Sequence, residues 1–218
     1  MSRYSDNDPY LDPATGVLKN RLGITDEATL QQTEADIVAA RSQELSQTPL
    51  KGNLDLVHLQ SIHGRLFGDV YEWAGELRTI DISKGGSRFA HYGHIESGAA
   101  PIFKQLAQEK HLAGLPPDPF SDRAAYYFGE LNALHPFREG NGRATREFIS
   151  HVAQANGYYV AWENVSQPNM LEASIRSFNG DTSQLARLIR ENLSTLDDQR
   201  ERLDCRDALR DQKQTGQG

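Results

Sequence analysis

Residues 135–146 read HPFREGNGRATR and lie between two apolar helical patterns. Pro136 cannot continue the incoming helix, so His135 stands at the end of that helix. Two glycines flank Asn141, where the next helix begins, and glycine lets backbone N–H groups come close to a ligand. Because the first N–H groups of a helix are unpaired and carry a partial positive charge, this stretch predicts an anion site suited to phosphate.

The charged side chains of the same stretch complete a set of groups for phosphoryl or nucleotidyl transfer. Arg143 and Arg146 lie on one helical face, and guanidinium forks match phosphate oxygens. Glu139 offers a carboxylate for the Mg²⁺ that accompanies a polyphosphate. His135 supplies a base whose ordinary pKa lies near neutrality. Each of these features alone is usually structural, whereas their combination at this spacing indicates a catalytic site.

Outward from this stretch, helical periodicity dominates the chain and predicts a mainly helical fold. We expect one domain over residues 1–196, with an extended arm over 1–24 and a core over about 54–195, and then a charged helix or tail over 197–218. The Gly-Gly turn within residues 77–92 predicts a β-hairpin, the only β element expected. Helices are expected over residues 25–45, 54–67, 95–112, 121–134, 142–154, 168–178 and 183–202.

Composition excludes several classes of protein. The 218 residues carry 23 basic and 30 acidic side chains, a formal charge of −7, which argues against direct binding to nucleic acid. The single cysteine, Cys205, excludes a disulfide framework within the chain. No apolar run approaches the roughly 18 residues of a membrane span, and the polar N-terminus has no apolar signal core. We therefore expect a cytoplasmic protein with no membrane partner, or one exported without a Sec signal.

Residues 135–146 resemble the signature of the Fic (Fido) family, HPFx[D/E]GNGRxxR, and match it at every specified position. The resemblance extends to the hairpin, called the flap in that family, and to residues 66–75. Residues 8–10 and 20–24 look like the N-terminus of bacterial Fic toxins. The resemblance implies a Fic-fold helical bundle with one β-hairpin flap. It also implies a protein adenylyltransferase that uses Mg²⁺ and transfers AMP from ATP to a hydroxyl side chain of a target protein.

The resemblance implies a role for each residue of the signature. His135 would deprotonate the target hydroxyl, and Glu139 would hold Mg²⁺ on the phosphates. Lys84 and Phe89 are the flap residues expected to close over nucleotide and target, and Asn179 is expected to contact the adenine. The groups expected to bind the phosphates lie at the start of the second helix: Gly140, Asn141, Gly142, Arg143 and Arg146.

Several alternatives stay open. Gly142 favours AMP transfer, because the kinase-like Doc branch has lysine at the matching position. Fic relatives that move UMP or phosphocholine share most of the loop, so another nucleotide or donor is an alternative. A catalytically silent nucleotide-binding module is a second alternative, although the intact His135 and Glu139 argue against it. A helical structural protein with a chance loop is a third.

A regulatory motif of the family is missing from this sequence. Many Fic proteins carry a helix with [S/T]xxxE[G/N], whose glutamate pairs with the second arginine of the signature. The chain has Glu-Gly or Glu-Asn only at Glu139, Glu163 and Glu191, and none follows a Ser or Thr by four residues. Within the family this implies inhibition in trans by a small antitoxin that supplies the glutamate. Such toxins modify the ATPase subunits of DNA gyrase and topoisomerase IV, the expected targets docked on the flap.

Overall fold

The computed structural model describes residues 8–84 and 87–201. They form a mainly helical bundle with a two-stranded antiparallel hairpin, which confirms the predicted fold class. The α-helices that lie wholly within these residues are α1 (Glu27–Gln47), α2 (Leu56–Phe67), α3 (Ile95–Gln108), α4 (Pro117–Leu134), α5 (Asn141–Ala155), α6 (Gln167–Phe178) and α7 (Ser183–Glu191), and residues 196–201 are also helical. The short 3₁₀ turns are η1 (Tyr92–His94), η2 (Lys110–Leu112) and η3 (Trp162–Asn164).

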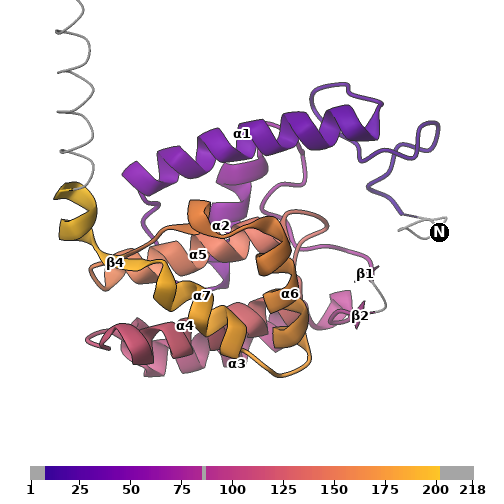
Figure 1. Cartoon of the computed structure of the whole chain (residues 1–218). Helices are drawn as coiled ribbons and strands as arrows, with labels where there is room; N and C mark the ends of the chain where they lie inside the picture. Colours follow the sequence, from indigo (N-terminus) through magenta and orange to yellow (C-terminus); the bar gives the residue numbers. More distant parts are fainter. Residues whose placement is uncertain (1–7, 85–86, 202–218) are drawn as a thin grey trace, which may run out of the picture.

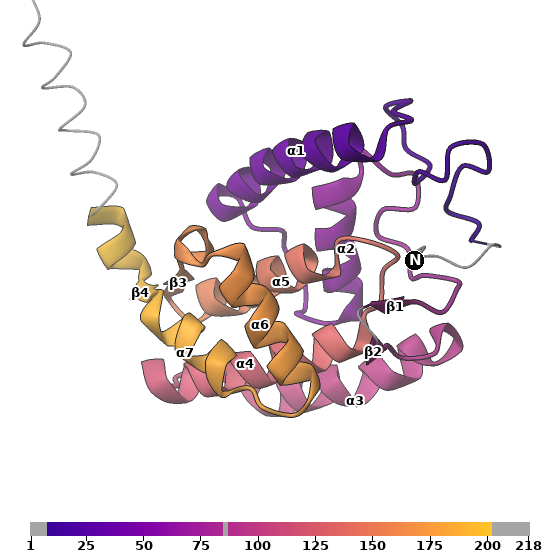
Figure 2. The same cartoon turned by 45° about the vertical axis from the view of Figure 1, so that its right-hand side comes forward.

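Helix α4 lies at the centre of the packing and contacts α3, α5, α6 and α7. Helix α2 packs against α5 and α1. In Figures 1 and 2, α1 crosses one side of the bundle, and α3 and α4 line the opposite side. The hairpin lies at one end of the molecule and β4 at the other (Figure 1). The loop between α4 and α5 lies beside the hairpin, because the ring of Phe89, which follows β2, stacks on that of His135, which ends α4.

Local sequence signals set most helix boundaries. Asp26 precedes α1 and accepts a hydrogen bond from the Thr29 N–H at 2.8 Å, which makes it the N-cap of this helix. Helix α4 begins at Pro117, so the predicted start of this helix at residue 121 is wrong. Proline fits the first helical position because no intrahelical acceptor exists there for an N–H.

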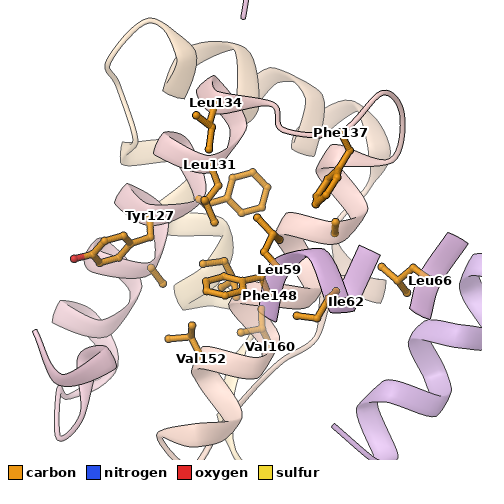
Figure 3. Close-up of a cluster of buried hydrophobic side chains, with 14 of the residues drawn as sticks. Leu59, Ile62, Leu66, Tyr127, Leu131, Leu134, Phe137, Phe148, Val152 and Val160 are labelled. Carbon is orange, nitrogen blue, oxygen red and sulfur yellow. The ribbon is translucent and has the colours of Figure 1, made fainter. Parts of the chain in front are cut away.

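The core is built from apolar residues at helical spacing, as the sequence predicts. Figure 3 draws this cluster, with Leu59 and Ile62 from α2, Leu131 from α4 and Phe148 from α5. Phe137 joins it from the loop between α4 and α5 and is only 1% exposed. Burial of a phenylalanine side chain contributes about 1.5–3 kcal/mol, so Phe137 anchors the loop to the core.

The hairpin exists but is shorter than expected. Strands β1 (Ser83–Lys84) and β2 (Ser87–Arg88) pair antiparallel, with Ser83 opposite Arg88 and Lys84 opposite Ser87. The rest of the predicted hairpin, residues 77–82 and 89–91, is irregular backbone. Residues 85–86 lie outside the described part of the chain.

A second strand pair was not expected. Strands β3 (Tyr158–Val160) and β4 (Leu193–Thr195) pair antiparallel, and α7 ends at Glu191. The predictions of a single β element and of a helix from Ser183 to Arg202 are therefore wrong. Three-residue strands are too short to give a period-two signal, which explains why the sequence pattern did not indicate them.

The predicted N-terminal arm packs against the bundle. Within residues 8–24 Leu11 and Leu18 form an isolated β-bridge, and Val17 is buried. The Arg21 N–H donates to the Val70 carbonyl at 2.8 Å. No helix within residues 8–84 or 87–201 is long and apolar enough to cross a membrane.

Candidate active site

His135 ends helix α4 in a left-handed conformation, with φ 48° and ψ 61°. For a residue with a side chain this conformation costs roughly 1–2 kcal/mol. The turn directs the chain out of the helix into Pro136 and the loop. Strain of this kind persists only where the surrounding structure holds the residue in place.

The imidazole of His135 has a defined tautomer. Its Nδ1 lies 3.0 Å from the carbonyl oxygen of Asn132, which can only accept a hydrogen bond. Nδ1 therefore carries the proton, and the lone pair lies on Nε2. This is the form in which a neutral histidine can take a proton from a substrate.

The flap reaches this imidazole through Phe89. The two rings stack with centroids 3.7 Å apart and an angle of 13° between their planes. Phe178 at the end of α6 meets Phe89 edge-on, with centroids 5.7 Å apart. The predicted flap residue thus lies directly against the predicted base.

The loop between α4 and α5 is closed by the side chain of Asn141. Its Oδ1 accepts from the Phe137 N–H at 2.8 Å, and its Nδ2 donates to the Phe137 carbonyl at 2.8 Å. Gly140 has φ +78°, and a Cβ there would lie 2.3 Å from the Phe67 ring. Only glycine fits this position, because both the backbone conformation and the space exclude a side chain.

Two backbone donors at the start of α5 have no acceptor within the described ranges. These are the N–H groups of Asn141 and Gly142. The next two N–H groups, of Arg143 and Ala144, return to the Gly140 carbonyl at 3.1 and 3.0 Å. Gly142 is exposed, and a Cβ there would meet no heavy atom within 4 Å. The open donors, the helix dipole and the open space are suited to bind an anion, as the sequence predicts.

The two arginines of α5 differ in their surroundings. Arg146 is half-buried, and its side chain makes no hydrogen bond or ion pair with any residue that the structure describes. Burial, and then the like charge of Arg143, lower its pKa. A partly desolvated guanidinium without a carboxylate partner is suited to bind an anionic ligand.

Arg143, in contrast, is held by carboxylates. Its Nη2 lies 2.5 Å from Glu34 of α1 and 3.6 Å from Glu139. Glu34 is buried and also accepts a hydrogen bond from the Tyr71 hydroxyl. The Arg143 guanidinium lies over the Phe67 ring, 4.8 Å from its centroid. These contacts fix Arg143 beside the loop.

Glu139 is the carboxylate beside the anion site. Its Oε1 accepts from the Gly140 N–H at 2.9 Å and faces Arg143. No group of three or more acidic, histidine or cysteine side chains in the described ranges could hold a metal ion. Mg²⁺ is usually bound by one or two carboxylates together with substrate phosphates, so a single carboxylate next to a phosphate cradle fits it.

His63 supports the backbone of Glu139 from inside the core. Its Nε2 donates to the Glu139 carbonyl at 3.0 Å, and its Nδ1 accepts from the Gly75 N–H at 2.8 Å. Burial lowers the pKa of His63 to about 4, so the imidazole is neutral at physiological pH. Its ring stacks on Phe137 with centroids 3.9 Å apart.

A buried ion pair joins the N-terminal arm to the loop. Asp8 accepts from Arg138 at 2.6 and 3.0 Å, and both side chains are almost fully buried. The sequence analysis missed Asp8, Glu34 and His63 as contributors to the site. Since Asp8 is 130 residues from Arg138, no local pattern could have indicated the pair.

Two remaining predicted residues lie at the edges of this site. Lys84 ends β1, and its side chain lies outside the described part of the structure. Asn179 follows α6 and is exposed, and its Nδ2 donates to the Ile175 carbonyl at 3.1 Å. The nucleotide contacts of these two residues stay predictions.

The chain is similar to known proteins over most of its length. The profile of the Fic/DOC family matches residues 53–153. Protein adenylyltransferase VbhT of Bartonella schoenbuchensis is 53% identical over 195 residues, which are 89% of this chain but 41% of that protein. The probable protein adenylyltransferase Fic of Salmonella typhimurium is 36% identical over 86% of this chain and 92% of its own length.

The fold is also found among solved structures. The BepC protein of Bartonella tribocorum, solved with bound AMPPNP, matches with a TM-score of 0.81 and 29% sequence identity. The match covers 85% of this chain and 96% of that one.

Proposed function

The chain belongs to the Fic/DOC family, and on that basis we propose that it transfers AMP from ATP to a hydroxyl group of a target protein. It is an enzyme, a protein adenylyltransferase of the nucleotidyltransferase class. The observation that supports the proposal is that the loop between α4 and α5 has a histidine at its start and a set of open N–H and guanidinium donors at its end. The base is Nε2 of His135, and the donors are the first N–H groups of α5 and the guanidinium of Arg146.

The proposed reaction uses these groups in one displacement. The target hydroxyl gives its proton to Nε2 of His135, and its oxygen forms a bond to the α-phosphorus of ATP. The bond from the α-phosphorus to the bridging oxygen breaks, and pyrophosphate leaves. The N–H groups of Asn141 and Gly142 stabilise charge on the phosphates. Arg146 binds the γ-phosphate. The N–H groups of Arg143 that do not pair with Glu34 or Glu139 bind other phosphate oxygens.

The metal has a defined place in this proposal. Glu139 would hold Mg²⁺ on the phosphates, where it screens their charge. Lys84 and Phe89 close over nucleotide and target, and Asn179 contacts the adenine. A segment of the target pairs with the edge of the flap as an additional β-strand, which aligns the hydroxyl group with the site.

Two finer proposals concern partners. The sequence lacks the family's inhibitory [S/T]xxxE[G/N] motif, which supports a small antitoxin that supplies an inhibitory glutamate in trans. In that reading the chain is a toxin, and its expected targets are the ATPase subunits of DNA gyrase and topoisomerase IV. Because ATP is the substrate, the proposed reaction takes place in a cytoplasm.

A transfer assay tests the proposal. The chain is incubated with α-labelled ATP, Mg²⁺ and bacterial lysate, in parallel with His135→Ala. We expect label in a discrete protein band with the intact chain and a loss of about 10²–10⁴-fold in rate for the variant, the usual contribution of a general base. Nucleotide binding by the variant, measured by titration calorimetry, should be retained.

Two outcomes would contradict the proposal. If His135→Ala modifies the target at the normal rate, His135 is not the base. If the intact chain binds ATP but labels no protein, and no other nucleotide replaces ATP, the chain is a binding module.

A further inference from the structure

Arg78 is a fully buried cation whose side chain meets only backbone carbonyls at hydrogen-bonding distance. The residue is 2% exposed. Its Nε donates to the His135 carbonyl at 2.8 Å, and its Nη1 donates to the Ile80 carbonyl at 2.7 Å. Its Nη2 donates to the carbonyl of Ala90 and, at 3.5 Å, to that of Leu134.

Two of these carbonyls belong to the end of helix α4. The last carbonyls of a helix lack intrahelical partners and carry partial negative charge, so a cation is favourable there. The backbone N–H of Arg78 also donates to the Pro136 carbonyl at 2.9 Å. Arg78 therefore holds the backbone on both sides of the α-carbon of His135, where the chain is in its strained left-handed turn.

The other two carbonyls belong to the two ends of the flap. Ile80 precedes β1, and Ala90 follows β2. Ala90 is the neighbour of Phe89, whose ring stacks on the His135 imidazole at 3.7 Å. One guanidinium group thus joins the catalytic histidine to both ends of the element that covers it.

The geometry requires arginine in particular. A guanidinium presents five N–H donors in a fixed planar fork, whereas a lysine presents three donors on one nitrogen. The nearest ion-pair partner of Arg78, Asp81, is at 3.8 Å, beyond a normal hydrogen bond. Because a buried cation is costly to desolvate, its retention here indicates that the four carbonyl contacts compensate for that cost.

We propose that Arg78 is a positioning residue for the transfer reaction, because it fixes the flap relative to the imidazole of His135. The proposal rests on the function proposed above, because it assumes that His135 is the base. Arg78 acts through backbone geometry and need not contact the nucleotide or the target. Its loss should lower the rate of transfer while nucleotide binding at the start of α5 is retained.

The experiment compares Arg78→Lys and Arg78→Ala with the intact chain. A matched control is Arg123→Lys, since Arg123 is a part-buried arginine of α4 that pairs with Glu109 away from the loop. We expect Arg78→Lys to lower kcat by about tenfold or more, as small misplacements do, with the KM for ATP changed by less than about threefold. Arg78→Ala should lose more, and Arg123→Lys should keep both constants.

Hydrogen exchange gives a readout that does not depend on activity. In Arg78→Lys the amides of Arg78, Tyr92 and His135 should exchange faster, whereas those within α7 should not change. If the intact chain transfers no AMP to protein, the proposed function is wrong. Hydrogen exchange then still tests whether Arg78 holds the flap against the backbone of His135. Unchanged kcat and local exchange in Arg78→Lys would overturn the proposal. Equal loss of protection in every helix would also overturn it, because Arg78 would then only stabilise the fold.

Discussion

The loop between α4 and α5 has two faces that differ in how their polar groups are satisfied. The inner face, formed by His63, Arg138, Arg143 and the side chain of Asn141, has a protein partner for each of these groups. The ligand face, formed by the N–H groups of Asn141 and Gly142 and by Arg146, has none in the part of the chain that the structure describes.

This difference is what the proposed anion site requires, because it lets the site be rigid and still open. Polar contacts on the inner face hold the backbone in one conformation, so the donors of the ligand face need no rearrangement when a phosphate arrives. Preorganised donors of this kind are the usual source of electrostatic stabilisation in a transition state. Substitutions on the two faces should therefore have different consequences: those on the ligand face should lower activity alone, and those on the inner face should also lower stability.

The two arginines of α5 give the largest expected effect. Arg146→Ala should lower kcat/KM by about 10²–10³-fold, because it removes a donor from the ligand face, and should leave the Tm almost unchanged. Arg143→Ala should in addition lower the free energy of unfolding by roughly 1–3 kcal/mol, because Glu34 stays buried without its cation. Transfer kinetics and thermal unfolding of both variants measure the contrast. Equal losses of Tm would contradict the division into two faces.

Substitutions of the two loop glycines should have smaller effects, again with stability lost at one position and ATP binding at the other. Gly140→Ala should lower the free energy of unfolding by roughly 2–3 kcal/mol, since the methyl group overlaps Phe67 and the left-handed backbone is strained. Gly142→Ala should fold as well as the intact chain, because its Cβ meets no protein atom, but should bind ATP more weakly. Denaturant unfolding measures the stability of both variants, and calorimetric titration measures their affinity for ATP. Normal ATP binding by Gly142→Ala would show that the phosphates do not approach this position.

The smallest expected effect concerns pH and His63. Burial lowers its pKa from 6.5 to about 4, so between these values the unfolded chain binds a proton that folded His63 does not. The stability contributed by the neutral imidazole is full above pH 6.5 and is lost as the pH falls toward 4. His63→Gln removes this group, so the slope of unfolding free energy against pH should fall by about 1.4 kcal/mol per pH unit in that window.

Denaturant unfolding of both proteins at several pH values between 4.5 and 6.5 measures the slopes. The advantage of the intact chain over His63→Gln should narrow as the pH decreases. Parallel curves would mean that His63 is not held neutral on the inner face.

The residues of the ligand face are local in the sequence, but the partners of the inner face are not. Asn141, Gly142 and Arg146 all lie within residues 135–146, where helix boundaries, glycine positions and arginine spacing predict an anion site. The partners of the inner face come from distant segments, as His63 does, 76 residues before Glu139. Local patterns do not encode such pairs.

The same reasoning explains the errors in the fold. Helix periodicity predicted most of the α-helices, because buried positions such as Phe148 and Val152 repeat along one face. The pairing of β3 with β4 is between short segments separated by α6 and α7, so neither strand has a sequence signal of its own. Arg78 carries no signal either, since its acceptors are backbone carbonyls.

The most direct test of the account compares α-labelled with γ-labelled ATP in the same transfer reaction, with the intact chain, Mg²⁺ and lysate. The ligand face is proposed to hold the phosphates while the target hydroxyl attacks the α-phosphorus. The account therefore predicts protein-bound label from α-labelled ATP and none from γ-labelled ATP. Label from γ-labelled ATP, dependent on His135, would mean phosphoryl transfer and would contradict it.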